Sequence, residues 1–189
     1  RLLALQEDQK LTAVLGRERP NVSRHVFRGG NFFMLRMLNR YRDELGVTAL
    51  PQEMALAAAR TEDHLREATA TVEVMDVSLT DGVLSATVEI RNMAGHKFPT
   101  AYPSRRAWLH VTVTDRGGDT VFESGAFSPD GRVIGDDHDA NGTTYEPHYA
   151  EITSPDQVQI YQSVMVDQAG EGTTGLMSAE RWAKDNRLL

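Results

Sequence analysis

The sequence predicts an α+β protein, with an N-terminal helical segment over residues 1–69, an antiparallel β-sandwich over residues 70–189 and a short C-terminal helix. Apolar residues recur at helical spacing before residue 69, and after it they alternate with a period of two. Turn signals separate the alternating runs, of which there are five or more. Such a succession of short strands is typical of an Ig-like sandwich or of a partial barrel.

Two helices are expected after a helical remnant at residues 1–20. The first follows Asn31, a good N-cap, and stops at Gly46, where a left-handed residue ends a helix. The second begins at Pro51, where the missing N–H costs nothing, and runs to about Ala68. The first has an apolar stripe and must pack on another surface: Phe32, Leu35, Leu38, Tyr41 and Leu45.

The strand pattern opens with a hairpin. Alternation begins at Ala70 and changes phase near Met75, which predicts a β-bulge. Asp81-Gly82 is a strong hairpin signal, and the return strand runs to Ile90.

Further strands are expected at residues 107–113, 121–123 and 158–166. Ser178 is then expected to N-cap the short C-terminal helix, which would contain Ala179, Trp182 and Ala183.

The composition argues against several classes of protein. A net charge of −7 and a pI near 5.3 argue against a nucleic-acid binder, which would carry a basic stripe. No apolar run approaches about 18 residues, so no transmembrane segment is expected. Because the chain has no cysteine, it forms no disulfide, no thiolate metal site and no C-x-x-C-H attachment to haem. It opens on Arg1 without a signal peptide, and we expect it to be part of a longer protein.

The stretch most suited to binding is the loop at residues 92–106, which lies between two strand-like runs. Gly95 permits unusual backbone angles, and Pro99 and Pro103 each fix φ, so the loop is expected to be stiff. It presents His96 together with two aromatic rings and two guanidiniums, the groups that a flat, anionic, metal-bearing ligand requires. The alternative is an ordinary connection whose arginines are solvated at the start of a strand.

The other histidines lack the short spacing of a zinc site. His25 precedes the pair Gly29-Gly30, which would let the backbone approach a large ligand closely. His64, on the shoulder of a helix, suits packing or capping as well as ligation, and His148 is left open. Two others are predicted to be surface residues: His110 and His138.

An acidic stretch after residue 136 resembles half of a calcium loop. Asp137, Asp139 and Asn141 place oxygen ligands at alternate positions, and Gly142 would allow the sharp turn. In the second half, His148 stands where the bidentate glutamate belongs. A solvated acidic loop is therefore the alternative to a calcium site.

Three stretches of the chain resemble the C-terminal part of periplasmic or extracellular multihaem c-type cytochromes: residues 24–31, 95–100 and 103–108. Residues 121–126 and 157–161 look similar too, so the likeness spans most of residues 24–189. The resemblance implies haem c attached outside this chain, which has no C-x-x-C-H. It implies His25 and His96 as distal axial ligands, with His64 and His148 as further candidates. It also implies cationic partners for the haem propionates: Lys97, Arg105 and Arg106.

The leading hypothesis is a non-catalytic, periplasmic or extracellular module for electron transfer. It would cap the haems carried by the upstream part of the same protein or by a partner cytochrome. The second hypothesis is a calcium-stabilised sandwich that binds a protein or glycan without a redox role. A third is an enzyme with a mononuclear, histidine-ligated metal.

Overall fold

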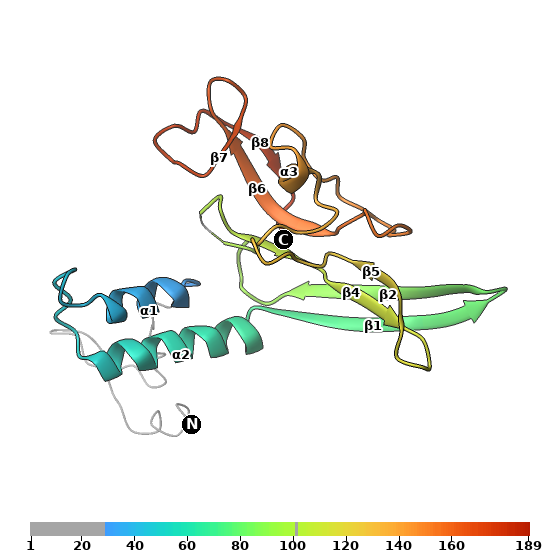
Figure 1. Ribbon diagram of the computed structural model, residues 1–189, viewed down its shortest axis with the longest axis horizontal. Coiled ribbons are helices and arrows are strands. Elements are labelled where there is room, and N and C mark those ends of the chain that lie inside the picture. The colour runs from blue at the N-terminus through green and yellow to red at the C-terminus, as the bar shows by residue number, and fades with distance from the viewer. Residues whose placement is uncertain (1–28, 101) are drawn as a thin grey trace, which may run out of the picture. The chain divides into compact units, whose positions relative to one another are not determined.

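The computed structural model describes residues 29–100 and 102–189 of the 189-residue chain, and these residues form an α+β fold (Figure 1). Two helices come first, and antiparallel strands follow in three separate sheets. The chain falls into two compact units that divide after Thr61, inside the second helix. The change from helix to strand occurs between Glu67 and Ala70, where the sequence predicts it.

Helix α1 (Phe32–Arg40) begins where the sequence predicts. The Asn31 side chain accepts a hydrogen bond of 2.8 Å from the amide three residues on, as an N-cap does. Regular helix ends earlier than expected, and the chain continues through turns to Gly46, whose φ is 62°. Arg42 stabilises these turns by donating a hydrogen bond to the Ala49 carbonyl.

Helix α2 (Pro51–Glu67) agrees with the predicted range to within one residue. Its first turn is capped by Glu53, whose carboxylate accepts from the Leu50 amide at 3.2 Å. Neither α1 nor α2 nor the short α3 (Asp137–Ala140) is long and apolar enough to span a membrane.

Strands β1 (Ala70–Thr80) and β2 (Val83–Asn92) form the predicted hairpin. The pairing shifts between Met75 and Ser78, which confirms the predicted bulge. Asp81 and Gly82 have φ values of 52° and 80°, as a tight turn with two left-handed residues requires.

One face of the β1–β2 hairpin is apolar and largely uncovered. Val72 pairs with Ile90, and Leu79 pairs with Leu84, so all four side chains lie on the same face. Val72 is 57% exposed and Leu79 is 72% exposed. A two-stranded hairpin is only marginally stable in water, so we expect another surface to cover this apolar face.

The remaining strands form two further sheets. In one, β6 (Ile160–Val166) pairs with three short strands; in the other, two strands pair with each other. The partners of β6 are β3 (Arg106–Trp108), β7 (Gly172–Thr173) and β8 (Arg181–Asp185). The two-stranded sheet contains β4 (Val111–Thr114) and β5 (Thr120–Ser124).

The single strand predicted at residues 107–113 is divided between these two sheets. Its first part, in β3, pairs with β6, and its second part, in β4, pairs with β5. The division falls at Leu109 and His110, where the Leu109 amide donates to the Gln159 carbonyl at 3.0 Å. Alternation along the sequence does not change at this point, so a change of partner strand leaves no local signal.

The predicted C-terminal helix is wrong, because residues 181–185 form strand β8. Lys184 pairs with Val164 of β6, and this backbone pairing overrides the local preference for a helix. The Ser178 hydroxyl donates to the Gly175 carbonyl at 3.0 Å instead of capping a helix.

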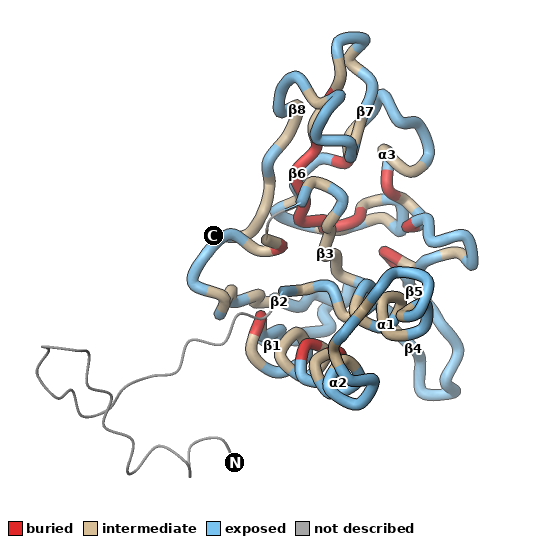
Figure 2. The backbone as a smooth tube through the Cα atoms, turned by 90° about the vertical axis from the view of Figure 1, so that its left-hand side faces the viewer, coloured by how far each residue is buried: buried red, intermediate tan, exposed pale blue. Residues whose placement is uncertain are grey.

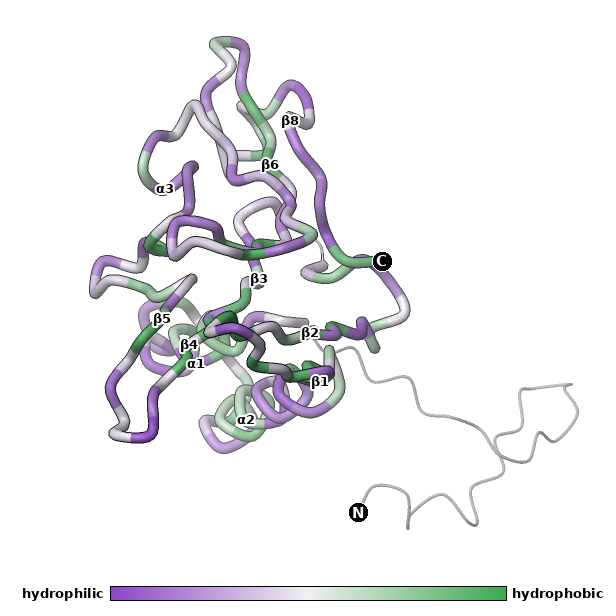
Figure 3. Tube along the Cα trace, turned by 90° about the vertical axis from the view of Figure 1, so that its right-hand side faces the viewer, coloured by the Kyte–Doolittle hydropathy of each residue, from purple (hydrophilic) through white to green (hydrophobic). Residues whose placement is uncertain are grey.

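Strand β6 and the residues just before it form the core of the unit that contains residues 62–189. They are the longest buried stretch in Figure 2, and the second half of β6 is hydrophobic in Figure 3. The buried apolar side chains here are Val158, Ile160, Tyr161, Val164 and Val166. Because its side chains are closely packed, β6 is expected to be rigid and to hold the loops around it in place.

Candidate functional site

The His96 loop leaves the end of β2 and turns its imidazole outward. Asn92 forms the turn: its side-chain oxygen accepts from the Ala94 amide at 2.9 Å, and its amide nitrogen donates to the His96 carbonyl at 2.6 Å. Gly95 adopts a φ of 70°, which favours glycine. His96 itself is exposed. The side chain is therefore accessible to a ligand, as the sequence predicts.

The two ring nitrogens of His96 have different surroundings. Nδ1 lies 3.2 Å from the Lys97 carbonyl oxygen, and Nε2 makes no hydrogen bond to any residue that the structure describes. A carbonyl only accepts, so in the neutral ring Nδ1 carries the proton and Nε2 keeps a free lone pair. Histidines that ligate metals are oriented in this way, with one nitrogen bonded to a backbone carbonyl and the other to the metal.

The part of the loop just after His96 is fixed to the C-terminal segment. Phe98 and Leu188 exchange two backbone hydrogen bonds of 2.8 Å, and Pro99 next to them is buried. The Lys97 ammonium lies 2.9 Å from the Asp185 carboxylate. Arg187, and to a smaller extent Lys97, lowers the pKa of Asp185 below its usual range by hydrogen bonding to the ionised carboxylate.

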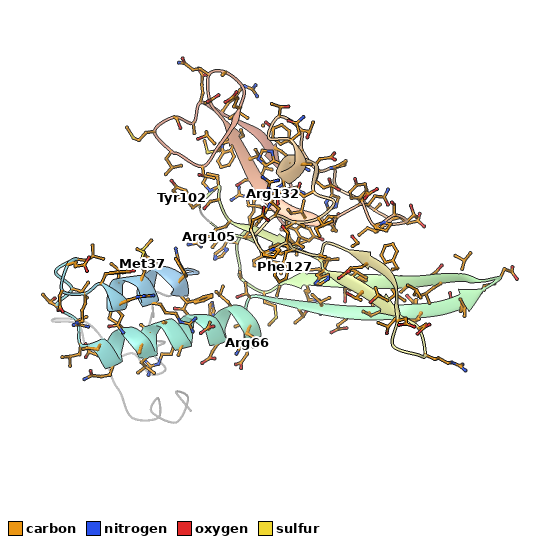
Figure 4. All side chains as sticks on the ribbon, in the orientation of Figure 1. Met37, Arg66, Tyr102, Arg105, Phe127 and Arg132 are labelled. Atoms are coloured by element: carbon orange, nitrogen blue, oxygen red, sulfur yellow. The ribbon has the colours of Figure 1, made fainter. Side chains whose placement is uncertain are left out.

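The three predicted propionate partners differ in what they already bind. Arg106 pairs with Asp136 at 3.2 Å and with Asp139 at 2.7 Å, and Lys97 has its carboxylate partner described above. Arg105 has no carboxylate partner among the described residues, and its guanidinium lies 3.5 Å from the Thr100 carbonyl. Figure 4 shows Arg105 beside Tyr102, in the loop before β3. Arg105 is thus the best placed of the three to bind an external anion.

Of the remaining histidine candidates, the two that the structure describes are less suited to ligation than His96. His25 lies outside the described residues. His64 is half-buried in the last turn of α2. The Gln159 amide nitrogen lies 2.9 Å from His148 Nδ1 and 3.3 Å from His148 Nε2, so it occupies the edge of the ring that a metal would approach. The Gln159 oxygen accepts from the Tyr149 amide at 3.0 Å, which fixes the orientation of the amide group.

The structure places the calcium candidates in and just after α3, and the side-chain oxygens of two of them already accept hydrogen bonds. Asp139 accepts from Arg106 and from the Val133 amide at 2.6 Å, and Asn141 accepts from the Thr143 amide at 3.2 Å. Within residues 29–100 and 102–189, no group of three or more His, Asp or Glu side chains is arranged to hold a metal ion. The calcium site stays a prediction.

A buried charge cluster lies beneath α3, and sequence reasoning missed it. Glu146 is fully buried and accepts from the amides of Asp137 and Val158 at 2.9 and 3.0 Å. Asp136 is also buried, and burial raises its pKa. Burial, followed by a hydrogen bond to Glu146, raises the pKa of Tyr149 to about 12. No short motif marks these residues, because the two amides that bind Glu146 are nine and twelve positions away along the chain.

Lys184 adds a cation to this cluster without a hydrogen-bond partner. It lies on β8, and its Nζ atom is buried and makes no hydrogen bond to the residues that the structure describes. Burial lowers its pKa, and the charges of Glu146 and Asp136 oppose that shift without cancelling it. The charged Lys184 ammonium therefore lowers the free energy of unfolding.

Replacing Lys184 with methionine is expected to raise the free energy of unfolding by about 1 to 3 kcal/mol, because an unsatisfied buried donor is removed. Stability of the unmodified chain should rise with pH just below 10.5, since there the unfolded chain holds a proton that the folded chain has lost. The variant should lack this rise. Urea unfolding at several pH values measures both effects, and Arg181→Met, on the exposed part of the same strand, is the control. A destabilised Lys184→Met chain would show that the ammonium is paired after all.

Comparison of the chain with protein-family models, with curated proteins and with solved structures found no match in any of the three. Its function is therefore inferred from its own residues.

Proposed function

We propose that the chain is the C-terminal module of a multihaem c-type cytochrome and that His96 supplies a distal axial ligand to a haem attached outside it. The observation that carries this proposal is the His96 ring, which is exposed, bonded at Nδ1, and without a hydrogen bond at Nε2 to any described residue. A neutral imidazole in this state fits haem iron. The resemblance of residues 24–31, 95–100 and 103–108 to such cytochromes supports the same conclusion.

Haem supplies the redox chemistry when it is bound, and the residues of this chain orient and shield it. The Lys97 carbonyl holds the rotation of the His96 ring and raises the basicity of Nε2. Arg105 is the residue proposed to pair with a propionate. We propose no catalytic role, because a haem iron bound by His96 and by a second histidine would have no position left for a substrate.

The proposed partner is a haem-bearing polypeptide, either the upstream part of the same protein or a separate cytochrome. The apolar face of the β1–β2 hairpin is the surface proposed to lie against it. This face is continuous with the His96 loop, because β2 runs into that loop at Asn92. Burying the face would keep water from the haem that His96 ligates, which affects its reduction potential.

Two finer features belong to the same proposal. The sheets of residues 70–189 are proposed to form a two-layer sandwich. Its core would contain the buried side chains of β6 and of the residues just before it. The module is proposed to work in the periplasm or outside the cell, where the cytochromes that it resembles are found. His25 is proposed as a second axial ligand.

Replacing His96 with alanine in the haem-bearing protein is expected to convert one haem iron from low-spin bis-histidine to high-spin. The reason is that an iron losing its sixth strong ligand has a weaker ligand field. Absorption and electron paramagnetic resonance spectra measure the change. His110→Ala is the matched control, since His110 is also exposed but already contacts Glu123 at 2.7 Å. Identical low-spin signals in the unmodified protein and in both variants would contradict the ligand role of His96.

A further inference from the structure

We propose that residues 185–188 act as a clasp that holds the His96 loop, and that Asp185 is the positioning residue for the imidazole. The inference rests on the ligand role proposed for His96 and adds what fixes the ring in place. Residues 185–188 lie about ninety positions further along the chain than the loop. Nothing in the local sequence of the loop points to them.

The backbone part of the clasp is the pairing of Phe98 with Leu188. Each amide donates to the carbonyl of the other at 2.8 Å. Asn92, which donates to the His96 carbonyl, also lies 3.3 Å from the Leu188 carbonyl with the same amide nitrogen. The residues on both sides of His96, Asn92 and Phe98, thus contact Leu188 of the clasp.

The side-chain part of the clasp is centred on Asp185. Its carboxylate accepts from Arg187 through two bonds of 2.8 Å and from Lys97 through one bond of 2.9 Å. Arg187 in turn lies over the Trp182 ring, 5.7 Å from its centroid. Paired charges with fixed geometry on both sides leave the Asp185 carboxylate little freedom to move.

Asp185 also connects the loop to the rigid core. Its backbone pairs with Ser163 of β6, which is almost completely buried. The contacts therefore run from β6 through Asp185 to Lys97, and the Lys97 carbonyl is the acceptor for His96 Nδ1. Releasing the Lys97 side chain would let this carbonyl move, and the ring would lose its fixed orientation.

The test uses the 189-residue chain and a ferric haem peptide whose iron carries one histidine and has an open sixth position. We compare Asp185→Asn with Asp130→Asn, which removes the same charge from an exposed pair with Arg132. Hydrogen exchange at the Phe98 and Leu188 amides reports on the clasp without any haem. Titration of the haem peptide, followed by its low-spin absorption band, reports on His96.

Asp185→Asn is expected to speed exchange at both amides and to weaken binding of the haem peptide roughly tenfold, as loss of a group supporting a metal ligand does. Asp130→Asn should change neither. Asp185→Glu, which keeps a carboxylate, should recover most of the affinity. Lys97→Met removes the same contact from the other side and should act in the same direction, so an Asp185→Asn chain that fails to fold still leaves a test.

Equal exchange rates and equal affinities in Asp185→Asn and Asp130→Asn would overturn the clasp. Faster exchange with unchanged affinity would overturn the positioning role. Failure of the proposed function gives a different result: His96→Ala would then bind the haem peptide as the unmodified chain does, while exchange at Phe98 would still respond to Asp185→Asn.

Discussion

Replacing Glu146 with alanine is expected to lower the free energy of unfolding by about 3 to 5 kcal/mol, because it removes a buried charge on which other buried groups depend. The Glu146 side chain is 0% exposed, and its two oxygens accept from two backbone amides, those of Asp137 and Val158. Alanine would leave both donors unsatisfied. It would also leave Lys184 without the strongest of the negative charges that oppose the lowering of its pKa.

Urea unfolding followed by tryptophan fluorescence measures the effect. Both tryptophans of the chain, Trp108 and Trp182, lie in the unit that contains Glu146, so the signal reports on that unit. Glu151→Ala is the control, since Glu151 is an exposed carboxylate five positions further on and its loss should change stability by less than about 0.5 kcal/mol. If the two variants unfolded at the same urea concentration, the buried carboxylate would have no structural role.

The parts of the fold that the sequence predicts correctly depend on neighbouring residues. Asn31 caps a helix through an amide three positions away, and Pro51 begins one by its own backbone geometry. Asp81-Gly82 turns the hairpin because both residues accept left-handed angles. Each of these signals is complete within a few residues, so it can be read without knowing the rest of the fold.

The parts that the sequence does not predict depend on partners far along the chain. Residues 181–185 belong to a stretch with helical spacing, yet they form a strand that pairs with β6. Arg106 is typical of a solvated strand start, yet its guanidinium is held by Asp136 and Asp139, some thirty positions later. A pattern within one segment cannot contain this information, since the partner is chosen by the tertiary structure.

At the candidate site, too, the features set by neighbouring residues are predicted and those set by other contacts are not. The sequence predicts the exposure of His96 from Gly95 and the prolines, which act locally. It does not predict which ring nitrogen is free, because that depends on the position of the Lys97 carbonyl. It also does not predict that Lys97 is bound to Asp185, which leaves Arg105 as the best placed cation of the loop.

An added methyl group at Gly125 is expected to disturb the fold strongly. The φ of Gly125 is 76°, and an added Cβ atom would lie 2.2 Å from the Leu109 carbonyl oxygen. The Gly125 carbonyl accepts from the Trp108 indole at 2.9 Å, so the backbone cannot move away without breaking that bond. The close approach occurs where the chain passes from β3 to β4, and it explains why glycine stands in the stretch at residues 121–126.

Gly125→Ala is therefore expected to lower the free energy of unfolding by about 3 to 5 kcal/mol, from the positive φ and from overpacking together. Gly118→Ala separates the two causes. Gly118 has a φ of 92°, but an added Cβ there meets nothing within 4 Å, so only the backbone contribution of about 1 to 2 kcal/mol should appear. Urea unfolding of both variants measures the difference. Equal losses would mean that Leu109 and Gly125 are not in close contact, and the passage from β3 to β4 would then need another explanation.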